Sequence, residues 1–280
     1  MVQKKLGKRS VNGTISQHRI SANAETDYWF SIYNRSDFLG DCYRQRLKQA
    51  LSWVDAFQIS QNAILLDAGC GVGISTQEMA KRGFHVIGLD FSDAMIKKAQ
   101  SVCEAKLWRK IQFMQGDVER LPFADHSFEV VVCLGVITYL RSESTTLSEI
   151  SRVLKPGGML ILSVVNKAHL AHYLDIPKFA HIRLLKTIGR KISHLNYSIS
   201  NGSNTGVRSF LIPEMRKSLV RQRFIVLDYA TIPLGLLTFS GRTIPPVELN
   251  AKVATLLGKT SGIPIIGSFG GMCIVKAVKG

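Results

Sequence analysis

The stretch LLDAGCGVG, residues 65–73, decides the fold. It begins as an apolar run typical of a buried strand, reaches Asp67, and turns through Gly69, Gly71 and Gly73 into a segment with helical spacing. Glycines let the backbone pass close to a ligand, and the N–H groups of the following helix face that ligand. The stretch therefore predicts a strand-turn-helix unit that binds a small molecule. Dinucleotide-binding sheets contain such turns too, and a tight turn without a ligand is the alternative.

Strands and helices alternate downstream of this turn. Continuous β-branched runs predict further buried strands at 84–90, 111–115, 128–134, 159–165, 224–230 and 272–278. Helical spacing or crossover length predicts helices at 75–82, 93–107, 143–154, 213–222 and 247–257. Alternation of this kind is typical of α/β folds. We predict a doubly wound, Rossmann-like, seven-stranded, mostly parallel sheet, with an N-terminal helical lid and helical insertions after strands 5 and 6.

The chain has 280 residues, of which 46% are hydrophobic, enough to bury one substantial core. We expect a mobile basic tail over 1–24 and a single domain over 25–280. Within that domain we expect three kinds of segment: a helical lid (25–60), a cofactor-binding core (61–165) and substrate-covering insertions (166–211 and 232–270).

The formal net charge of +16 raises the question of a nucleic-acid partner, but the position of the charge matters more than its total. Residues 61–165 balance 11 basic against 11 acidic side chains, whereas residues 166–224 carry 11 basic against two acidic. The five cysteines are widely spaced and form no C-x-x-C pair, so we expect neither disulfides nor a metal site. No apolar run reaches the length of a spanning helix, and we expect a cytoplasmic protein.

Acidic residues follow the second and third predicted strands. Asp90 ends the second strand in GLDFSDAMI, 21 residues beyond Gly69, where a carboxylate can accept hydrogen bonds from both hydroxyls of a ribose. Asp117 follows the third strand in QGDVERLPF, in position to bond the amino group of an adenine ring. Two further elements complete the series, LGVITYL at 134–140 after the fourth strand and LKPGG at 154–158, a sharp turn into the fifth.

In combination these elements resemble the class I S-adenosylmethionine (AdoMet)-dependent methyltransferases, in the small-molecule branch that includes ubiquinone/menaquinone C-methyltransferases. The match spans about residues 60–166 and consists of D-x-G-C-G-x-G at 67–73, G-x-D-x-S-x-x-M at 88–95, G-D-x-x-x-L-P-F at 116–123 and L-K-P-G-G at 154–158. The resemblance implies methyl transfer from AdoMet, with S-adenosylhomocysteine as product and no metal.

The resemblance also assigns cofactor contacts, each with simple packing as its alternative. The methionine part would contact Asp67, Gly69, Cys70, Gly71 and Gly73, and its ammonium group the backbone of Leu134 and Gly135. The ribose would contact Asp90, and the adenine would contact Phe91, Met95, Gly116, Asp117 and Val118. The pattern A-x-x-x-Y-W-x-x-x-Y at 24–33 is similar to the lid helix of this branch, which suggests that Tyr33 or Tyr28 closes over the cofactor, with core packing as the alternative.

The acceptor side is less determined by the resemblance. Thr138 and Tyr139 would face the acceptor, and the other candidates to contact it are Tyr28 and Tyr173. If the acceptor needs a general base, the candidates are Tyr139, His169, His172, Tyr173, His181 and His194. Arg46 either pairs with the methionine carboxylate or an acidic substrate, or lies on a solvated helix face, and the sequence favours the solvated face.

The basic, amphipathic segment 176–195 has three interpretations. It packs as a lid, rests on an anionic membrane surface, or clamps an anionic substrate. The variable segments are rich in apolar side chains, which favours a lipophilic or anionic small-molecule acceptor of prenylated, polyketide-like or tetrapyrrole type. Rival functions are an NAD-dependent oxidoreductase, a nucleic-acid methyltransferase and a non-catalytic AdoMet-binding protein; no recognition module supports nucleic acid as the partner. The oligomeric state is open.

Overall fold

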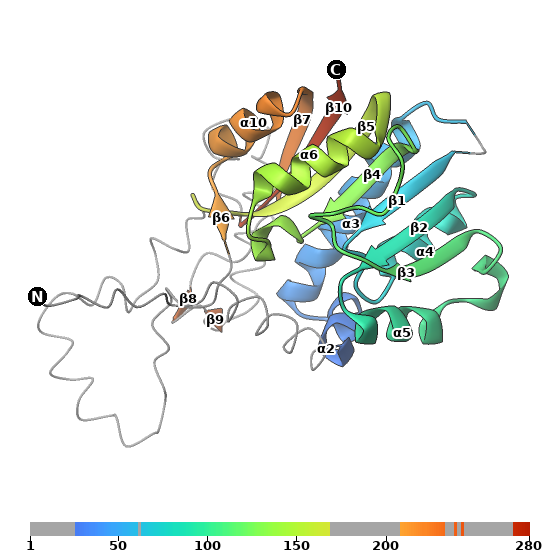
Figure 1. The fold of residues 1–280 in the computed structure, drawn as a ribbon. Coiled ribbons are helices and arrows are strands. Elements are labelled where there is room, and N and C mark those ends of the chain that lie inside the picture. The colour runs from blue at the N-terminus through green and yellow to red at the C-terminus, as the bar shows by residue number, and fades with distance from the viewer. Residues whose placement is uncertain (1–25, 61–62, 169–207, 233–237, 240–241, 244–270) are drawn as a thin grey trace, which may run out of the picture.

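One mixed sheet forms the centre of the fold, with the strand order β3-β2-β1-β4-β5-β10-β7 (Figure 1). The computed structural model describes residues 26–60, 63–168, 208–232, 238–239, 242–243 and 271–280. The strands of this path are β1 (Ile64–Ala68), β2 (His85–Asp90), β3 (Ile111–Gln115), β4 (Phe128–Leu134), β5 (Leu154–Asn166), β7 (Phe224–Ile232) and β10 (Met272–Lys279).

The first five strands of the path pair in parallel, whereas β10 runs antiparallel to both β5 and β7. The predicted doubly wound, mostly parallel α/β sheet is therefore confirmed. The predicted count of seven strands is too low, because the two-residue strand β6 (Ser209–Phe210) also pairs with β5. It does so at Val165 and Asn166, beyond the last residue pair that β5 makes with β4, where the edge of β5 is open. The strands β8 (Thr238–Phe239) and β9 (Arg242–Thr243) form a separate pair.

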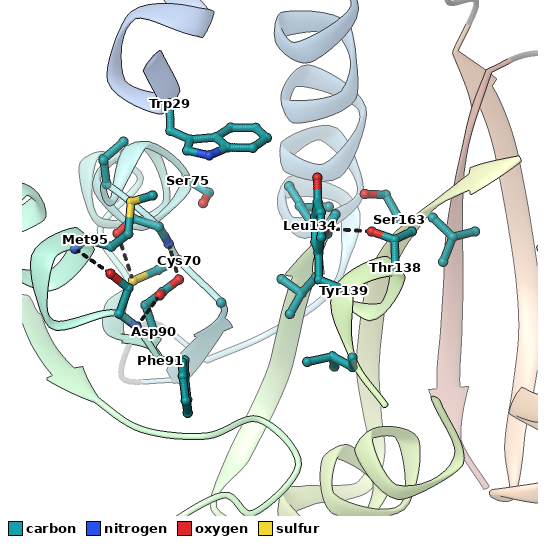
Figure 2. A pocket seen from close by; sticks show the side chains of 18 of the residues that line it. Trp29, Cys70, Ser75, Asp90, Phe91, Met95, Leu134, Thr138, Tyr139 and Ser163 are labelled. Atoms are coloured by element: carbon teal, nitrogen blue, oxygen red, sulfur yellow. Dashed lines mark hydrogen bonds between the residues drawn. The ribbon is translucent and has the colours of Figure 1, made fainter. Parts of the chain in front are cut away.

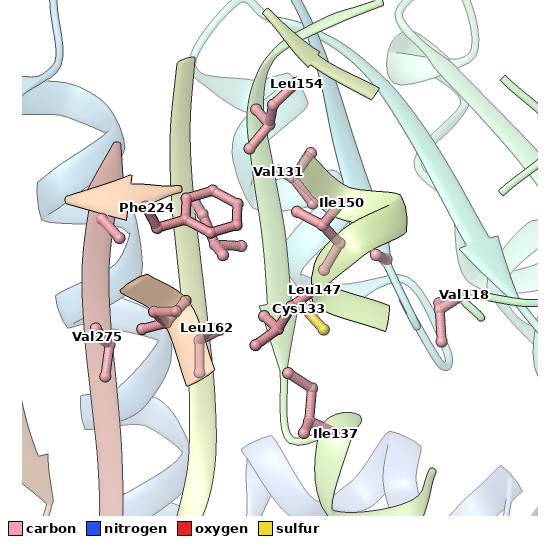
Figure 3. Packing of buried hydrophobic residues seen from close by; sticks show 14 of the residues in the cluster. Val118, Val131, Cys133, Ile137, Leu147, Ile150, Leu154, Leu162, Phe224 and Val275 are labelled. Atoms are coloured by element: carbon pink, nitrogen blue, oxygen red, sulfur yellow. The ribbon is translucent and has the colours of Figure 1, made fainter. Parts of the chain in front are cut away.

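Helices cover both faces of the sheet. One face packs against α6 (Glu143–Val153) and α10 (Ile212–Arg221), and Figure 3 shows Leu147 and Ile150 of α6 against this face. The other face packs against α3 (Phe38–Ala56), α4 (Ile74–Lys81) and α5 (Asp93–Val102). Successive side chains of β5 point to opposite faces of the sheet. Leu160 and Leu162 therefore pack in the core on the α6 and α10 face, and Ile161 packs in the core on the α3, α4 and α5 face.

Two predicted boundaries differ from the structure. The helix expected over 93–107 ends at Val102, because the backbone N–H of Glu104 donates to Gln77 Oε1 at 3.0 Å and a 3-10 turn, η2 (Ala105–Leu107), follows. The LKPGG segment, expected as a turn, belongs to β5. Its pairing shifts between Phe128 and Val130, so residues 155–158 bulge from the ladder and keep a turn-like positive φ of 73° at Gly157.

The predicted lid corresponds to α2 (Thr26–Ser31), the 3-10 turn η1 (Ile32–Asn34) and α3. The helices predicted over 176–195 and 247–257 lie outside the described residues, as does the tail over 1–24. In the part of the chain that the structure describes, no helix combines the length and apolar character that a bilayer span requires.

Gly73 is required for the junction between the glycine turn and α4. It caps α4 with φ +79°, and a Cβ there would lie 2.8 Å from Phe113 Cζ. We therefore expect Gly73→Ala to lower the free energy of unfolding by about 2–4 kcal/mol. The alanine backbone would be strained in the left-handed conformation, and its Cβ would overpack against Phe113. Urea denaturation measures this. Gly157→Ala is the matched control, since Gly157 has φ +73° but open space around its Cβ position, and an equal loss in both variants would contradict overpacking at Gly73.

Candidate functional site

A cavity of about 320 Å³ opens at the carboxyl ends of β1, β2 and β4 (Figure 2). The glycine turn after β1 forms its floor, the β2–α5 junction forms one end, and the segment after β4 together with β5 forms the other end. Residues of α2, η1 and α3 line it as well. Ligand sites in open α/β sheets lie at this edge, so the cavity occupies the position that the sequence predicts for the ligand.

The glycine turn is fixed to the neighbouring strand by its backbone. Gly69 N and Cys70 N both donate to the carbonyl oxygen of Leu89 on β2, at 2.7 and 3.0 Å. Gly69 has φ +80°, and a Cβ there would lie 2.3 Å from a Val136 methyl carbon, so only glycine fits between the strand and the segment after β4. The turn is thereby held with its backbone against the cavity.

Asp90 stands at the β2 end of the cavity. Its Oδ2 accepts from Gly71 N and its Oδ1 from Ser92 N, both at 2.9 Å, which ties the carboxylate to the glycine turn and to the start of α5. Burial raises the pKa of Asp90, and these backbone N–H groups oppose the rise. The Phe91 backbone also bonds to this carboxylate. The two oxygens together offer about four acceptor positions, so the carboxylate can still accept from a ligand hydroxyl. Phe91 and Met95 line the same end.

Asp67 lies behind the glycine turn and is not among the residues that line the cavity. It is buried, and its Oδ2 accepts from Ser75 Oγ at 2.7 Å and Thr76 Oγ1 at 2.6 Å. Burial raises the pKa of Asp67 to about 6, although the two hydroxyl donors oppose the rise. The structure thus places this carboxylate where it ties the end of β1 to the first turn of α4.

The raised pKa of Asp67 predicts a pH dependence of stability. Its folded pKa of about 6 exceeds the ordinary value of 3.8, so the folded state favours the neutral acid. The cost of ionising it in the folded state therefore develops as the pH rises from about 4 to 6 and is complete above that range, at roughly 3 kcal/mol. Asp67→Asn removes this cost. Urea unfolding from pH 4 to 7 should show the variant gaining stability over the unsubstituted protein as the pH rises, and a constant difference would contradict the prediction.

The helices ahead of β1 contribute an aromatic group and a cation to the cavity. Trp29 and Tyr33 each lie within 6.0 Å of the Tyr43 ring, centroid to centroid, and all three line the cavity. The Arg46 guanidinium carbon lies 4.5 Å from the Tyr43 ring centroid, and Arg46 Nη2 donates to Tyr33 Oη at 3.0 Å. These contacts connect α2, η1 and α3 around one positive charge.

The sequence favours a position for Arg46 on a solvated helix face, and the structure shows that this interpretation is wrong. The residue is 5% exposed, lines the cavity, and forms no ion pair with any carboxylate of the described residues. Its Nε has no hydrogen-bond partner in the described part of the chain, and its Nη1 lies 2.7 Å from the position that a Cβ of Gly135 would take. A buried guanidinium without an anion is costly, so this one could pair with a ligand anion near the end of β4.

The β4–β5 end of the cavity combines hydroxyl groups with an apolar wall. Thr138 is 1% exposed and its Oγ1 donates to the Gly135 carbonyl at 3.3 Å, while Tyr139 is 39% exposed at the rim. Ser163 on β5 is 1% exposed and its Oγ has no hydrogen-bond partner. Apolar side chains form a wall there, namely Val136, Leu140, Val164, Val165 and Met272, and the lining also includes Arg141.

The structure brings most of the predicted site residues together. Those that line the cavity are Tyr33, Gly69, Cys70, Gly71, Asp90, Phe91, Met95, Asp117, Leu134, Gly135, Thr138 and Tyr139. Those that do not line it are Tyr28, Asp67, Gly73, Gly116 and Val118. Val118 is instead part of the core on the α6 face. His169, His172, Tyr173, His181 and His194 lie outside the described residues.

Of the two adjacent aromatic residues on α2, Trp29 lines the cavity, whereas Tyr28 is 41% exposed. Consecutive helical positions differ by about 100° in direction, so only one of the pair can face inward. Trp29, Tyr43 and Ser163 are among the lining residues that sequence reasoning did not assign to the site, and Arg46 is a lining residue for which it favoured another role. Among the described residues, no three His, Cys, Asp or Glu side chains are grouped as a metal site would need.

Comparisons with known proteins agree with this geometry. Residues 66–162 match the sequence profile of the family described as "Methyltransferase domain". A sterol 24-C-methyltransferase of Gibberella zeae is 40% identical over 97 residues, which are 34% of this chain and 26% of that protein. A ubiquinone biosynthesis O-methyltransferase of Maricaulis maris is 36% identical over 113 residues, which are 40% of this chain and 44% of that protein.

The solved structure of magnesium protoporphyrin IX methyltransferase from Synechocystis with bound SAM shares the fold. Its TM-score is 0.62 at 18% identity, and the alignment covers 98% of this chain and 100% of that one. The chain spans only about a quarter to a half of the curated relatives it matches first. The substrates of those proteins are therefore properties of those proteins and are not assigned to this chain.

The fold and the site define a class: a doubly wound sheet with a ligand cavity between a glycine turn and an acidic end of β2. The core of this chain, residues 66–162, matches the methyltransferase-domain family. This confirms the family assignment made from the motifs, with AdoMet as the cofactor of the class.

Proposed function

We propose that this chain binds AdoMet in the cavity and transfers its methyl group to a small, largely apolar acceptor. The carrying observation is the pair of charges along the cavity, with the Asp90 carboxylate at the β2 end and the unpaired Arg46 guanidinium over Gly135 after β4. AdoMet presents a ribose diol and an α-carboxylate, which complement these two groups in that order.

The remaining contacts follow from this orientation. Phe91 and Met95 would pack on the faces of the adenine, and Asp117 would accept from its amino group. The backbone of the glycine turn would lie along the methionine chain, and the carbonyl groups of Leu134 and Gly135 would accept from its ammonium. Asp67 would act from behind the turn by holding α4 in place.

AdoMet supplies an electrophilic methyl carbon on a sulfonium, so the protein has to orient the acceptor and exclude water. Trp29 and Tyr33 line the cavity from the lid side and would limit access of water to the sulfonium. Tyr139 is at the rim of the acceptor end and is the described candidate for accepting a proton from the acceptor. His169 and His172 stay predictions, because they lie outside the described residues.

A prenylated, polyketide-like or tetrapyrrole acceptor remains our proposal for the substrate. The apolar wall formed by Leu140, Val165 and Met272 supports it, because a sugar or amino acid would leave polar groups unpaired there. Names of the similar proteins also support it, since they refer to sterol, ubiquinone and magnesium protoporphyrin IX chemistry.

Calorimetric titration of the full chain tests the cofactor part. We expect saturable binding of AdoMet and S-adenosylhomocysteine and none of NAD; absence of heat from both AdoMet species would overturn the proposal. Incubating a cell extract with the protein and methyl-labelled AdoMet, followed by mass spectrometry, then identifies the acceptor. Label found only in RNA or DNA would support a nucleic-acid methyltransferase instead, and absence of any labelled product despite binding would support a non-catalytic protein.

A further inference from the structure

Ser163 is a buried polar residue whose hydroxyl the described part of the chain leaves unsatisfied. It is 1% exposed and lines the cavity, and its Oγ has no hydrogen-bond partner among the described residues. Buried hydroxyls in folded proteins are almost always hydrogen-bonded, so an unpaired one that lines a cavity indicates a ligand partner.

The described surroundings of Ser163 offer its hydroxyl no partner. In the sheet register Ser163 lies between Leu134 of β4 and Ile274 of β10, and neither side chain has a polar atom. The nearby Thr138 hydroxyl donates its proton to the Gly135 carbonyl. Figure 2 shows Ser163 and Thr138 at the same end of the cavity, opposite Asp90 and Phe91. Since Ser163 lines the cavity, a ligand there is in position to be its partner.

The position of Ser163 indicates that its hydrogen-bond partner is the methyl acceptor and not AdoMet, the methyl donor. Three strand spacings separate β2 from β5 across the sheet, which is about 14 Å. Arg46 lies over Gly135 after β4, where it would bind the AdoMet carboxylate, so the proposed donor runs from Asp90 on β2 to the end of β4. Ser163 lies on β5, one strand further along the sheet, which is the side that the proposed acceptor would occupy.

We propose that Ser163 binds the acceptor, and that the acceptor is an apolar molecule with an oxygen atom that accepts a hydrogen bond from the Ser163 hydroxyl. Ketone, enol and phenol oxygens have this chemistry. The apolar side chains of Val165 and Met272 on the same wall require that the rest of the acceptor be hydrocarbon-like. This inference rests on the proposed function and specifies its substrate class.

A matched pair of small probes tests the proposal. The full chain, saturated with S-adenosylhomocysteine, is titrated with p-cresol and with p-xylene, which replaces the hydroxyl by a methyl group, and binding is followed by ligand-observed NMR. We expect p-cresol to bind about fivefold or more tightly than p-xylene, because the hydrocarbon leaves the buried hydroxyl unpaired. Ser163→Ala should abolish this preference and Ser163→Thr should keep it.

Thr146→Val is the matched control, because Thr146 is a buried hydroxyl residue on α6 that does not line the cavity. It should leave the preference unchanged. No binding of p-cresol, or a preference that persists in Ser163→Ala, would overturn the proposal; the second result would mean that another group binds the cresol oxygen.

Titration with S-adenosylhomocysteine alone separates failure of this inference from failure of the proposed function. We expect the unsubstituted chain and Ser163→Ala to bind it with the same affinity. A tenfold loss in Ser163→Ala would place Ser163 on the donor side and overturn the inference while the proposed function stands. If the unsubstituted chain does not bind S-adenosylhomocysteine, the proposed function itself fails, whatever the probes show.

Discussion

Replacing Asp90 with alanine is expected to weaken AdoMet binding by about 100-fold or more while leaving the fold intact. The carboxylate would accept hydrogen bonds from both ribose hydroxyls, and each bond to a charged group contributes about 1.5–3 kcal/mol. The same carboxylate accepts from Gly71 N and Ser92 N, so its loss also loosens the glycine turn against which the methionine chain would lie. Calorimetric titration with AdoMet measures the loss.

Asp93→Ala is the matched control for this variant. Asp93 begins α5 three residues further on, is exposed, and pairs with Lys97, so its removal deletes a carboxylate without touching the cavity. We expect unchanged affinity in the control, and unchanged far-ultraviolet circular dichroism in both variants. Near-normal AdoMet affinity in Asp90→Ala would show that the ribose is held by another group.

The parts of the fold that the sequence predicts well are those that local pattern determines. Strands β1 and β4 are buried on both faces, and their continuous apolar runs have no helical alternative of the same length. The glycine turn is equally local, because positive φ at Gly69 and Gly71 demands glycine at those positions. The end of α5 is different, since it depends on a hydrogen bond from Glu104 to Gln77 on another helix.

The site residues that the sequence does not reveal are set by tertiary packing. The residue pattern of α3 cannot show that Arg46 lies against Gly135 at the end of β4, because the two segments are about 90 residues apart in the sequence. Trp29 and Tyr28 are adjacent aromatics, and only the orientation of α2 decides which one faces the cavity. Ser163 leaves one signal in the sequence, a single hydroxyl within the apolar strand run MLILSVV.

Arg46→Met is expected to weaken S-adenosylhomocysteine binding by about 100-fold, because it removes a charge-assisted pair with the α-carboxylate inside a buried site. Binding of 5′-methylthioadenosine should not change, since that molecule has the adenosine and thioether but no amino-acid chain. Comparing the two ligands by calorimetry therefore locates the effect at the carboxylate. Equal losses for both ligands would mean that Arg46 acts through the shape of the cavity.

Arg44→Met is the control for a cation on the same helix. Arg44 is held by the carbonyl oxygens of Tyr33 and Arg35 and by the Asp41 carboxylate, and it does not line the cavity. Its replacement should leave the affinity for S-adenosylhomocysteine unchanged. A large loss in this variant would indicate that the lid helices, rather than the Arg46 charge, control binding.

The stability of the Arg46→Met variant provides an independent measurement of the same charge. In the ligand-free protein Arg46 is buried, lacks a carboxylate partner in the described part of the chain and leaves its Nε unpaired. An apolar side chain of similar length removes this desolvation cost, so the free energy of unfolding without ligand should stay within about 1 kcal/mol or increase. Adding S-adenosylhomocysteine should then raise the Tm of the unsubstituted protein more than that of the variant, because only the former pairs the ligand carboxylate with a buried cation. A large loss of ligand-free stability would instead assign Arg46 to the structure of the lid.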